Sequence, residues 1–321
     1  MVGGDEILKP GEIRSKFKDL PYITPYDRIY ALTDGLGEEV ELHEFHARGV
    51  CMGGSAWEVY HFPRTSCLVT SARREGPRNI LHCRVGVDDL DLIPGLAGAG
   101  IERVNVFDDH VEITYAGLAG GGVAATLCRG MADGVEGVVI ESIGGGAKIG
   151  RARLVLPRLY KVVVGVDDTD DAEKGATWSL MNEVAWRTQE EGLGIYLGHT
   201  VVQLFPQNPY RTTNGCATAV TFGIGQGVEG EFVHFLLQEV DRGCYSDEAA
   251  AAVYGSLCVH PALARYTRAV KSRMVELEEA EKVAGETDVD LESIRGKRGF
   301  IGALATLAGE ADPDTAVHPY A

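Results

Sequence analysis

A run of valines in the middle of the chain is the feature that most limits its fold. Val162, Val163, Val164 and Val166 are interrupted only by Gly165. A continuous β-branched run of this kind is typical of a strand that is buried on both faces. Such a strand needs a covering layer on each side, and segments with helical character follow it along the chain. We therefore predict a mixed α/β (α+β) fold.

Four acidic residues follow this strand directly: Asp167, Asp168, Asp170 and Asp171. Like charges so close repel one another, and at a strand end they are partly desolvated. Aspartates at the carboxyl end of a parallel-type strand commonly hold Mg²⁺, which bridges carboxylates to substrate phosphates. The alternative is an exposed turn that caps the next helix. Because four acids exceed what capping requires, we predict that Asp167, Asp168 and Asp170 hold metal and phosphate.

Three later segments carry groups that suit an anion. Lys174 and Gly175 precede a helix start, where backbone amides favour a phosphate. The loop "NPYRTTNG" contains Arg211, whose planar guanidinium is suited to phosphate. "RGKRG" places three basic residues before a further helix. A solvated lysine and an ordinary hairpin loop are the alternatives for the first two segments.

A glycine loop stands out in the N-terminal half. "YAGLAGGGVAATL" joins a strand to a helix and includes Gly120 and Gly121. It is similar in kind to phosphate loops but matches neither GxxxxGKS nor GxGxxG, so a tight turn is the alternative. In the same half, "HEFH" lacks the i, i+4 spacing of a helical zinc site. His43 and His46 would face opposite ways on a strand, and we expect surface histidines.

Pro157 precedes the valine run and marks a boundary. We predict two domains, an N-terminal α+β domain with glycine-rich loops at 1–158 and an acid-loop domain at 159–321. The first is expected to contain strands at 39–49, 56–63 and 67–74, a hairpin, glycine loop and helix over 104–131, and two strands over 137–157. The second is expected to contain strands at 194–205 and 216–224, and helices at 175–191, 229–241, 247–257, 261–283 and after 299.

The charge of the chain argues against general nucleic-acid binding. The net charge is −17, and residues 161–321 hold 13 basic against 25 acidic residues. A surface this acidic repels a polyphosphate backbone. The seven cysteines form no CxxC pair, which argues against a zinc ribbon and suits reduced thiols. No apolar run approaches the ~20 residues of a membrane span and the N-terminus lacks an apolar h-region, so we expect a cytoplasmic protein without a membrane partner.

Four ordered motifs carry a resemblance to a known family. "GVDDTD", "KGATWS", "LFPQNPYRTTNGCA" and "GKRGFIGALA" occur in the order and approximate spacing of archaeal 2-agmatinylcytidine synthetase. That family uses ATP to activate an anticodon cytidine of an isoleucine tRNA, and the resemblance covers most of residues 161–310. With "PYITPYDRIYALTD", "GGSAWEVYHF" and "YAGLAGGGVAA" included, the whole chain resembles methanogenesis marker protein 11, an archaeal family associated with methanogens.

The resemblance implies a kinase-like and ferredoxin-like fold for the C-terminal half, with Mg²⁺ and ATP as cofactors. The three aspartates correspond to the acidic loop associated with magnesium and ATP. The remaining matched positions, at the helix start, in the loop near the reacting nucleotide and in the late basic turn, are Lys174, Gly175, Thr177, Asn208, Pro209, Arg211, Thr212, Asn214, Gly215, Arg298 and Gly299.

Three departures from the synthetase bear on its activity. Its helix start has two adjacent threonines, one of which becomes phosphorylated, whereas Trp178 follows Thr177 here, and this argues against autophosphorylation. The loop at Arg211 has lost one base. The sequence also shows no oligonucleotide-binding barrel and no zinc ribbon, the parts that hold tRNA. We therefore expect that tRNA is not a partner.

These observations lead to three hypotheses about function. The first is a Mg²⁺/ATP-dependent transferase or ligase of methanogenic archaea that transfers a phosphoryl or nucleotidyl group to an unidentified acceptor. Asp167, Asp168, Asp170 and Arg211 would be its catalytic residues, since such transfers depend on positioning and electrostatics. The acceptor would be linked to methanogenesis, through cofactor synthesis or maturation of methyl-coenzyme M reductase. The second is a non-catalytic nucleotide-binding assembly or regulatory factor, and the third an RNA-modifying enzyme. A methanogenesis protein partner and a homo-oligomer stay open.

Overall fold

The computed structural model describes residues 6–319, and the chain divides into two compact units at residues 159 and 160. Both units combine strands with helices, so the predicted mixed α/β class is confirmed. The strand β10 (Lys148–Asp167) contributes to both: its residues 148–157 pair in the first unit and its residues 160–167 in the second. Within residues 6–319, no helix combines the length and apolar character needed to cross a bilayer.

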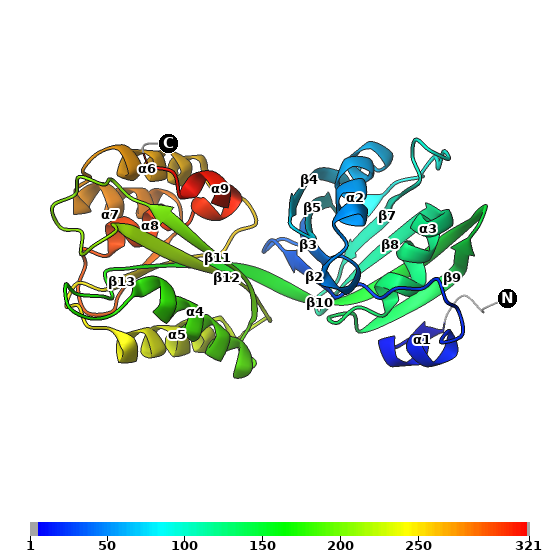
Figure 1. The fold of residues 1–321 in the computed structure, drawn as a ribbon, viewed down its shortest axis with the longest axis horizontal. Helices are drawn as coiled ribbons and strands as arrows, with labels where there is room; N and C mark the ends of the chain where they lie inside the picture. Colours follow the sequence, from blue (N-terminus) through cyan, green and yellow to red (C-terminus); the bar gives the residue numbers. More distant parts are fainter. Residues whose placement is uncertain (1–5, 320–321) are drawn as a thin grey trace. The chain divides into compact units, whose positions relative to one another are not determined.

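The first unit is built from antiparallel strands with one long helix. β4, β5, β3 and β2 pair in that order, and β1, β9, β10, β8, β7 and β6 form a second series. The helix α2 packs against β4, β5 and β7 (Figure 1). The elements before β10 are β1 (Ile7–Leu8), α1 (Pro10–Lys16), β2 (Arg28–Thr33), β3 (Glu39–Phe45), a 3-10 turn (Ala47–Gly49), α2 (Met52–Thr65), β4 (Val69–Glu75), β5 (Arg78–Arg84), β6 (Gly86–Val87), β7 (Ala99–Val106), β8 (His110–Leu118), α3 (Ala119–Val123), a π-helix (Ala124–Cys128) and β9 (Gly137–Gly145).

The strand predicted at 56–63 is wrong, because this segment is part of α2. Ser55, Glu58 and Phe62 recur at helical spacing and are buried, whereas Trp57 and Tyr60 are exposed. Because Glu58 is polar, the buried face of the helix is not apolar throughout. The sequence of the segment therefore suggested the alternation of apolar and polar residues that is typical of a strand.

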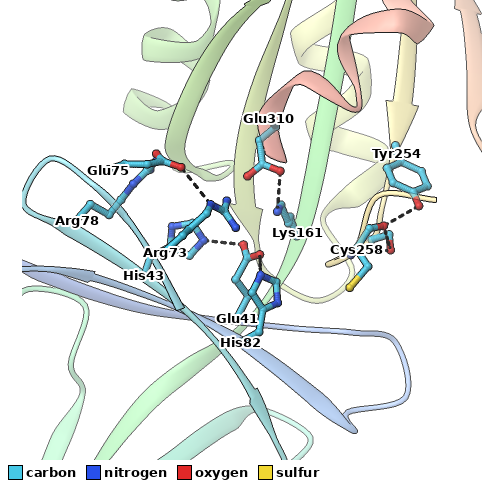
Figure 2. Close-up of polar contacts among 11 residues, drawn as sticks. Glu41, His43, Arg73, Glu75, Arg78, His82, Lys161, Tyr254, Cys258 and Glu310 are labelled. Carbon is cyan, nitrogen blue, oxygen red and sulfur yellow. Dashed lines mark hydrogen bonds and ion pairs between the residues drawn. The ribbon is translucent and has the colours of Figure 1, made fainter. Parts of the chain in front are cut away.

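The expectation of surface histidines is also wrong. β3 is buried on both faces, and His43 and His46 are buried with it. Glu41 of this strand pairs with Nε2 of His43 at 2.7 Å and Nε2 of His82 at 3.1 Å (Figure 2). Charged groups in this unit are therefore part of its interior.

The centre of the first unit holds a buried arginine between two glutamates. Arg129 donates from Nε and Nη2 to the two carboxylate oxygens of Glu44, at 3.0 and 2.9 Å. Its Nη2 lies 3.0 Å from Oε1 of Glu58, and the hydroxyl of Tyr115 donates to Glu44 at 2.6 Å. All four side chains are at least nine-tenths buried. Buried charges persist only when paired and hydrogen-bonded in this way.

The second unit is a five-stranded antiparallel sheet in the order β11, β12, β10, β13, β14. The helices α4 and α5 cover one face, and α6, α7 and α8 cover the other (Figure 1). The elements after β10 are α4 (Thr177–Glu190), β11 (Ile195–Gln203), β12 (Cys216–Ile224), α5 (Glu229–Gly243), β13 (Ala250–Tyr254), α6 (Pro261–Ser272), α7 (Leu277–Glu286), β14 (Asp290–Ser293), α8 (Phe300–Thr306), a 3-10 turn (Gly309–Ala311) and α9 (Pro313–Ala316).

The valine run is buried on both faces, as predicted. Val162, Val164 and Val166 pack under α4 and α5, whereas Val163 packs under the other helical layer. Gly165 lets α8 approach closely, since a Cβ there would lie 2.1 Å from the carbonyl oxygen of Ala303. The expected parallel-type pairing is wrong, because β10 is antiparallel to both β12 and β13.

Two predicted helices of this unit are also wrong in kind or length. The segment 247–257 contains β13, whose alanines are buried from both sides by helices. Alanine is a strong helix former, and tertiary burial overrides this preference here. The helix expected at 261–283 is two helices, α6 and α7, separated by residues 273–276.

The second unit also contains a buried lysine that is paired with a glutamate. Nζ of Lys161 donates to Glu310 at 3.0 Å (Figure 2).

Candidate functional site

A cavity of about 770 Å³ opens at the carboxyl end of β10, within the second unit. Its volume falls in the range of small-molecule sites, roughly 300–1,000 Å³. The antiparallel sheet delivers four chain segments to this place: the acid loop after β10, the loop between β11 and β12, the residues before β13 and the turn before α8. The start of α4 and the link between α6 and α7 complete its wall.

The acid loop turns its aspartates into the cavity. Asp167, Asp168 and Asp170 all line it. Asp168 has a left-handed backbone (φ 57°), which aspartate tolerates better than most residues, and its amide donates to Oδ1 of Asp167 at 2.8 Å. The turn therefore holds adjacent carboxylates at the strand end with one of them bound to the backbone.

The carboxylates are short of positive charge. Burial raises the pKa of Asp167 well above its usual value, and the charge of Asp168 raises it further. Burial also raises the pKa of Asp168, although Arg298 opposes this rise. A cation beside this pair would be stabilised, because it would relieve both the desolvation and the repulsion.

Arg298 is the basic side chain that contacts the aspartates. Its Nε donates to Oδ2 of Asp168 at 3.1 Å, and its guanidinium lies 5.7 Å from the ring centroid of Tyr210. The backbone of the turn is held by Glu248, which accepts from the amide of Arg298 at 3.3 Å through its side chain and from the amide of Gly299 at 3.0 Å through its carbonyl. The turn before α8 is thus fixed to Glu248 in the segment that precedes β13.

Hydroxyl groups connect the acid loop to its neighbours. Thr177, the first residue of α4, donates to Oδ1 of Asp170 at 3.0 Å, and Thr169 donates to Thr177 at 2.9 Å. Thr212, from the loop between β11 and β12, donates to Oδ2 of Asp170 at 3.4 Å. Asp170 therefore joins the acid loop, the helix start and this loop.

Two glycines allow α8 to lie against the strand end. A Cβ on Gly302 would lie 1.8 Å from Oδ2 of Asp167, and a Cβ on Gly299 would lie 2.9 Å from the backbone oxygen of Asp167. Both distances are far below van der Waals contact. The match of "GKRGFIGALA" to a glycine-basic turn thus has a steric reason: larger residues would displace Asp167.

The structure gathers most of the predicted site residues at this cavity. Those that line it are Asp167, Asp168, Asp170, Gly175, Thr177, Asn208, Arg211, Thr212, Asn214 and Arg298. Lys174 is exposed and outside the lining. Gly120 and Gly121 lie in α3 of the first unit and do not line this cavity either.

The alternative interpretation of the acid loop applies to its last residue. Oδ1 of Asp171 accepts from the amides of Glu173 and Lys174, both at 2.7 Å. These bonds close a tight turn and lower the pKa of the exposed Asp171. One aspartate therefore shapes the turn, and the other three face the cavity.

The carboxylates of the acid loop fit a magnesium ion that takes part of its ligands from phosphates and water. Among residues 6–319, no three His, Cys, Asp or Glu side chains converge on one point as a fully protein-bound metal would need. Mg²⁺ is usually held by one or two carboxylates and takes its other ligands from phosphates and water. Asp167 and Asp168, which are adjacent in the acid loop and both line the cavity, are suited to that partial ligation.

Sequence reasoning missed several residues of the wall, including Glu248, Tyr210 and Arg273. Glu248 was hidden by the wrong helix at 247–257, since its place beside Arg298 depends on β13 pairing with β10. Tyr210 stands inside "NPYRTTNG", the signal that could have found it. Arg273 lies in the break between α6 and α7, which the sequence did not indicate.

Comparison with known proteins shows that a central segment of the chain is similar to a known domain. Residues 163–251 match the TiaS TCKD domain. Two solved structures share a similar stretch, namely a complex of TiaS with an isoleucine tRNA and ATP (25% identity, 46% of this chain, TM-score 0.42) and a tRNA fluorescent labeling enzyme (24% identity, 45% of this chain, TM-score 0.41). The chain spans 35% of the length of each of these two proteins.

Most of the chain is similar to a known protein over nearly the full length of that protein. It is 39% identical to "Uncharacterized protein MJ0921" of Methanocaldococcus jannaschii over 282 residues, which cover 88% of this chain and 93% of the relative. The chain therefore belongs to the family of MJ0921.

Proposed function

We propose that the chain is a nucleotide-using enzyme that transfers a phosphoryl or nucleotidyl group from Mg²⁺·ATP. The observation that carries this proposal is the convergence of Asp167, Asp168 and Asp170 with Arg211 and Arg298 on one cavity. The TCKD match supports it, because the solved TiaS structures include a complex with ATP.

Each group has a defined task in this proposal. Asp167 and Asp168 would hold the magnesium ion, which screens the phosphates and orients them when bound. Arg298, together with Arg211 from the opposite loop, would neutralise charge on the transferred group. Transfers of this kind depend mainly on positioning and electrostatic stabilisation. Asp170 would keep the acid loop and the loop between β11 and β12 in register through its two threonine contacts.

We expect ATP affinity to depend steeply on magnesium. Without the ion, the negative phosphates would be repelled by the carboxylates of Asp167 and Asp168, which have too few positive neighbours to neutralise them. Calorimetry with ATP in Mg²⁺ and in EDTA should show a loss of at least about a hundredfold in affinity, the change expected when a close charge partner worth several kcal/mol is removed. The control variant is Asp171→Asn, because Asp171 belongs to the same loop but lies outside the cavity lining. Its ATP affinity should depend on magnesium as steeply as that of the wild type. Equal affinity in EDTA would rule out the metal-dependent site.

The products separate the two kinds of transfer. ADP would indicate phosphoryl transfer and AMP nucleotidyl transfer, and incubation with extract fractions would supply the acceptor. Binding of Mg²⁺·ATP without turnover in any fraction would favour the second hypothesis, a nucleotide-binding assembly or regulatory factor.

The link to methanogenesis belongs to this proposal as well. The family relative comes from Methanocaldococcus jannaschii. The motifs quoted in the sequence analysis resemble methanogenesis marker protein 11. We propose an acceptor in cofactor synthesis or in maturation of methyl-coenzyme M reductase, in the cytoplasm. All seven cysteines are free thiols, as suits a reducing compartment. Deletion of the gene in a methanogen, followed by assay of reductase activity and coenzyme levels, tests this assignment.

RNA modification is the second candidate, because the matched TiaS structure contains tRNA as well as ATP. The expectation that tRNA is no partner has no support from this comparison. Charge still separates the two candidates. With 13 basic against 25 acidic residues in 161–321, we expect the chain to bind total archaeal tRNA no more tightly than a non-specific background of about 10⁻⁴ to 10⁻⁶ M. A salt-sensitive, sub-micromolar complex in a mobility-shift assay would instead establish the RNA candidate.

A further inference from the structure

Arg298 contacts an oxygen of Asp168 that a metal ion would also use in the proposed function. Its Nε lies 3.1 Å from Oδ2 of Asp168, and Asp168 is only 17% exposed. At this oxygen the guanidinium and a metal ion would therefore compete. A divalent ion at this oxygen would also repel the guanidinium at short range.

The backbone of Arg298 is held by hydrogen bonds, whereas its side chain is partly exposed. Two bonds from Glu248 hold the backbone at Arg298 and Gly299, and the helix α8 begins at Phe300. The side chain is 40% exposed and faces the cavity. The ring of Tyr210 lies 5.7 Å from the guanidinium of Arg298, and a cation–π interaction with this ring would stabilise the guanidinium when it is not paired with Asp168.

We propose that Arg298 is an exchangeable counter-ion of the site. In this structure it pairs with Asp168. With a metal–polyphosphate bound, the carboxylate of Asp168 would hold the metal, and Arg298 would donate its hydrogen bonds to the phosphate instead. This inference rests on the proposed function and adds a selectivity to it: the site discriminates against free divalent metal and accepts the metal–polyphosphate complex.

Removal of Arg298 should therefore change two affinities in opposite directions. In Arg298→Ala, binding of Mn²⁺ alone, followed by electron paramagnetic resonance, should tighten about tenfold, since a competing cation is lost. Binding of a non-hydrolysable ATP analogue with Mn²⁺ should weaken about tenfold, since a phosphate donor is lost. Arg298→Gln should behave in the same way, because it also lacks the charge.

Arg295 provides the matched control. It lies three residues away in the same turn, pairs with Asp241 at 2.7 Å and is outside the cavity lining. Arg295→Ala should leave both affinities unchanged. If both Arg298 variants fold but weaken both affinities, or leave Mn²⁺ binding unchanged, the exchange is overturned and Arg298 is a fixed structural contact. Failure of the wild-type chain to bind the Mn²⁺–analogue complex is a separate result, which overturns the proposed function itself.

Discussion

Asp168→Asn should lower the affinity for Mg²⁺·ATP, and any turnover, by at least about a hundredfold, the scale seen when one preorganised electrostatic group is removed from a site. The substitution keeps the size of the side chain and removes the charge that both the metal and Arg298 use. Calorimetry with Mg²⁺·ATP measures the first effect, and release of ADP or AMP measures the second.

The fold should tolerate this change. Burial raises the pKa of Asp168 despite Arg298, so folding disfavours the ionised carboxylate relative to the unfolded chain. A group with a raised pKa contributes stability below its unfolded pKa, about 3.9 for aspartate, and loses it as the pH rises through the folded value. Asparagine does not ionise and loses nothing on that rise. The melting temperature of Asp168→Asn relative to the wild type should therefore be more favourable at pH 7 than at pH 4.

Two results would contradict this prediction. A large loss of stability at pH 7 without nucleotide would mean that Asp168 is a structural cap for the turn. An unchanged affinity for Mg²⁺·ATP in a folded variant would remove Asp168 from the site. Asp171→Asn, in the same loop, controls for a general effect of lowering the negative charge.

The core of the second unit was predictable because its signals are local. A β-branched run can be read without knowledge of its partners, and Val162 to Val166 are buried on both faces as predicted. The pairing direction was not predictable, since it depends on β12 and β13, which lie far along the chain. The predictions for the alanine-rich β13 and for the helical segment 56–63 were wrong for a related reason, because burial by distant elements overrode the local pattern.

The candidate site shows the same division. The aspartates and the basic turn were readable because each stands in a short motif beside a strand or helix end. Glu248 was not, because it acts through the amide of Arg298, 50 residues away. The opposite error occurred at Lys174, where a suitable local composition gave a side chain outside the cavity lining. Local chemistry identifies candidates, and the antiparallel register decides which of them meet.

The buried ion cluster of the first unit leads to the second large effect. Arg129→Met should reduce the free energy of unfolding of that unit by about 3 to 5 kcal/mol, the cost of breaking a buried pair from one side. Methionine fills most of the volume but removes the guanidinium that pairs with both Glu44 and Glu58. Urea denaturation followed by Trp57, the tryptophan of this unit, measures the loss once Trp178 and Trp186 are replaced by Phe.

The pH dependence identifies the cause. Burial alone would raise the pKa of Glu58, but Arg129, with hydrogen bonds from His46 and Tyr26, outweighs it and lowers the pKa to about 2. A lowered pKa contributes stability above the unfolded value, about 4.3 for glutamate, and loses it as the pH falls towards 2. The gap between the wild type and Arg129→Met should therefore narrow over that interval, because acid neutralises the carboxylates that the arginine had paired.

Arg153 is the matched control for this cluster. It lies on β10, is 36% exposed and pairs at 2.8 Å with Glu112, which is 12% exposed, so Arg153→Met should cost less than Arg129→Met because water screens this arginine. Replacing Glu44 and Glu58 by Gln in the Arg129→Met background should recover part of the loss, since it removes the unpaired charges. The prediction is contradicted if Arg129→Met is as stable as Arg153→Met. It is also contradicted if the difference in the free energy of unfolding between the wild type and Arg129→Met stays the same as the pH falls from 5 towards 2. Either result would show that the cluster makes no net contribution to stability. The recovery by the glutamine changes distinguishes buried charge from lost packing, because only the former is relieved without restoring volume.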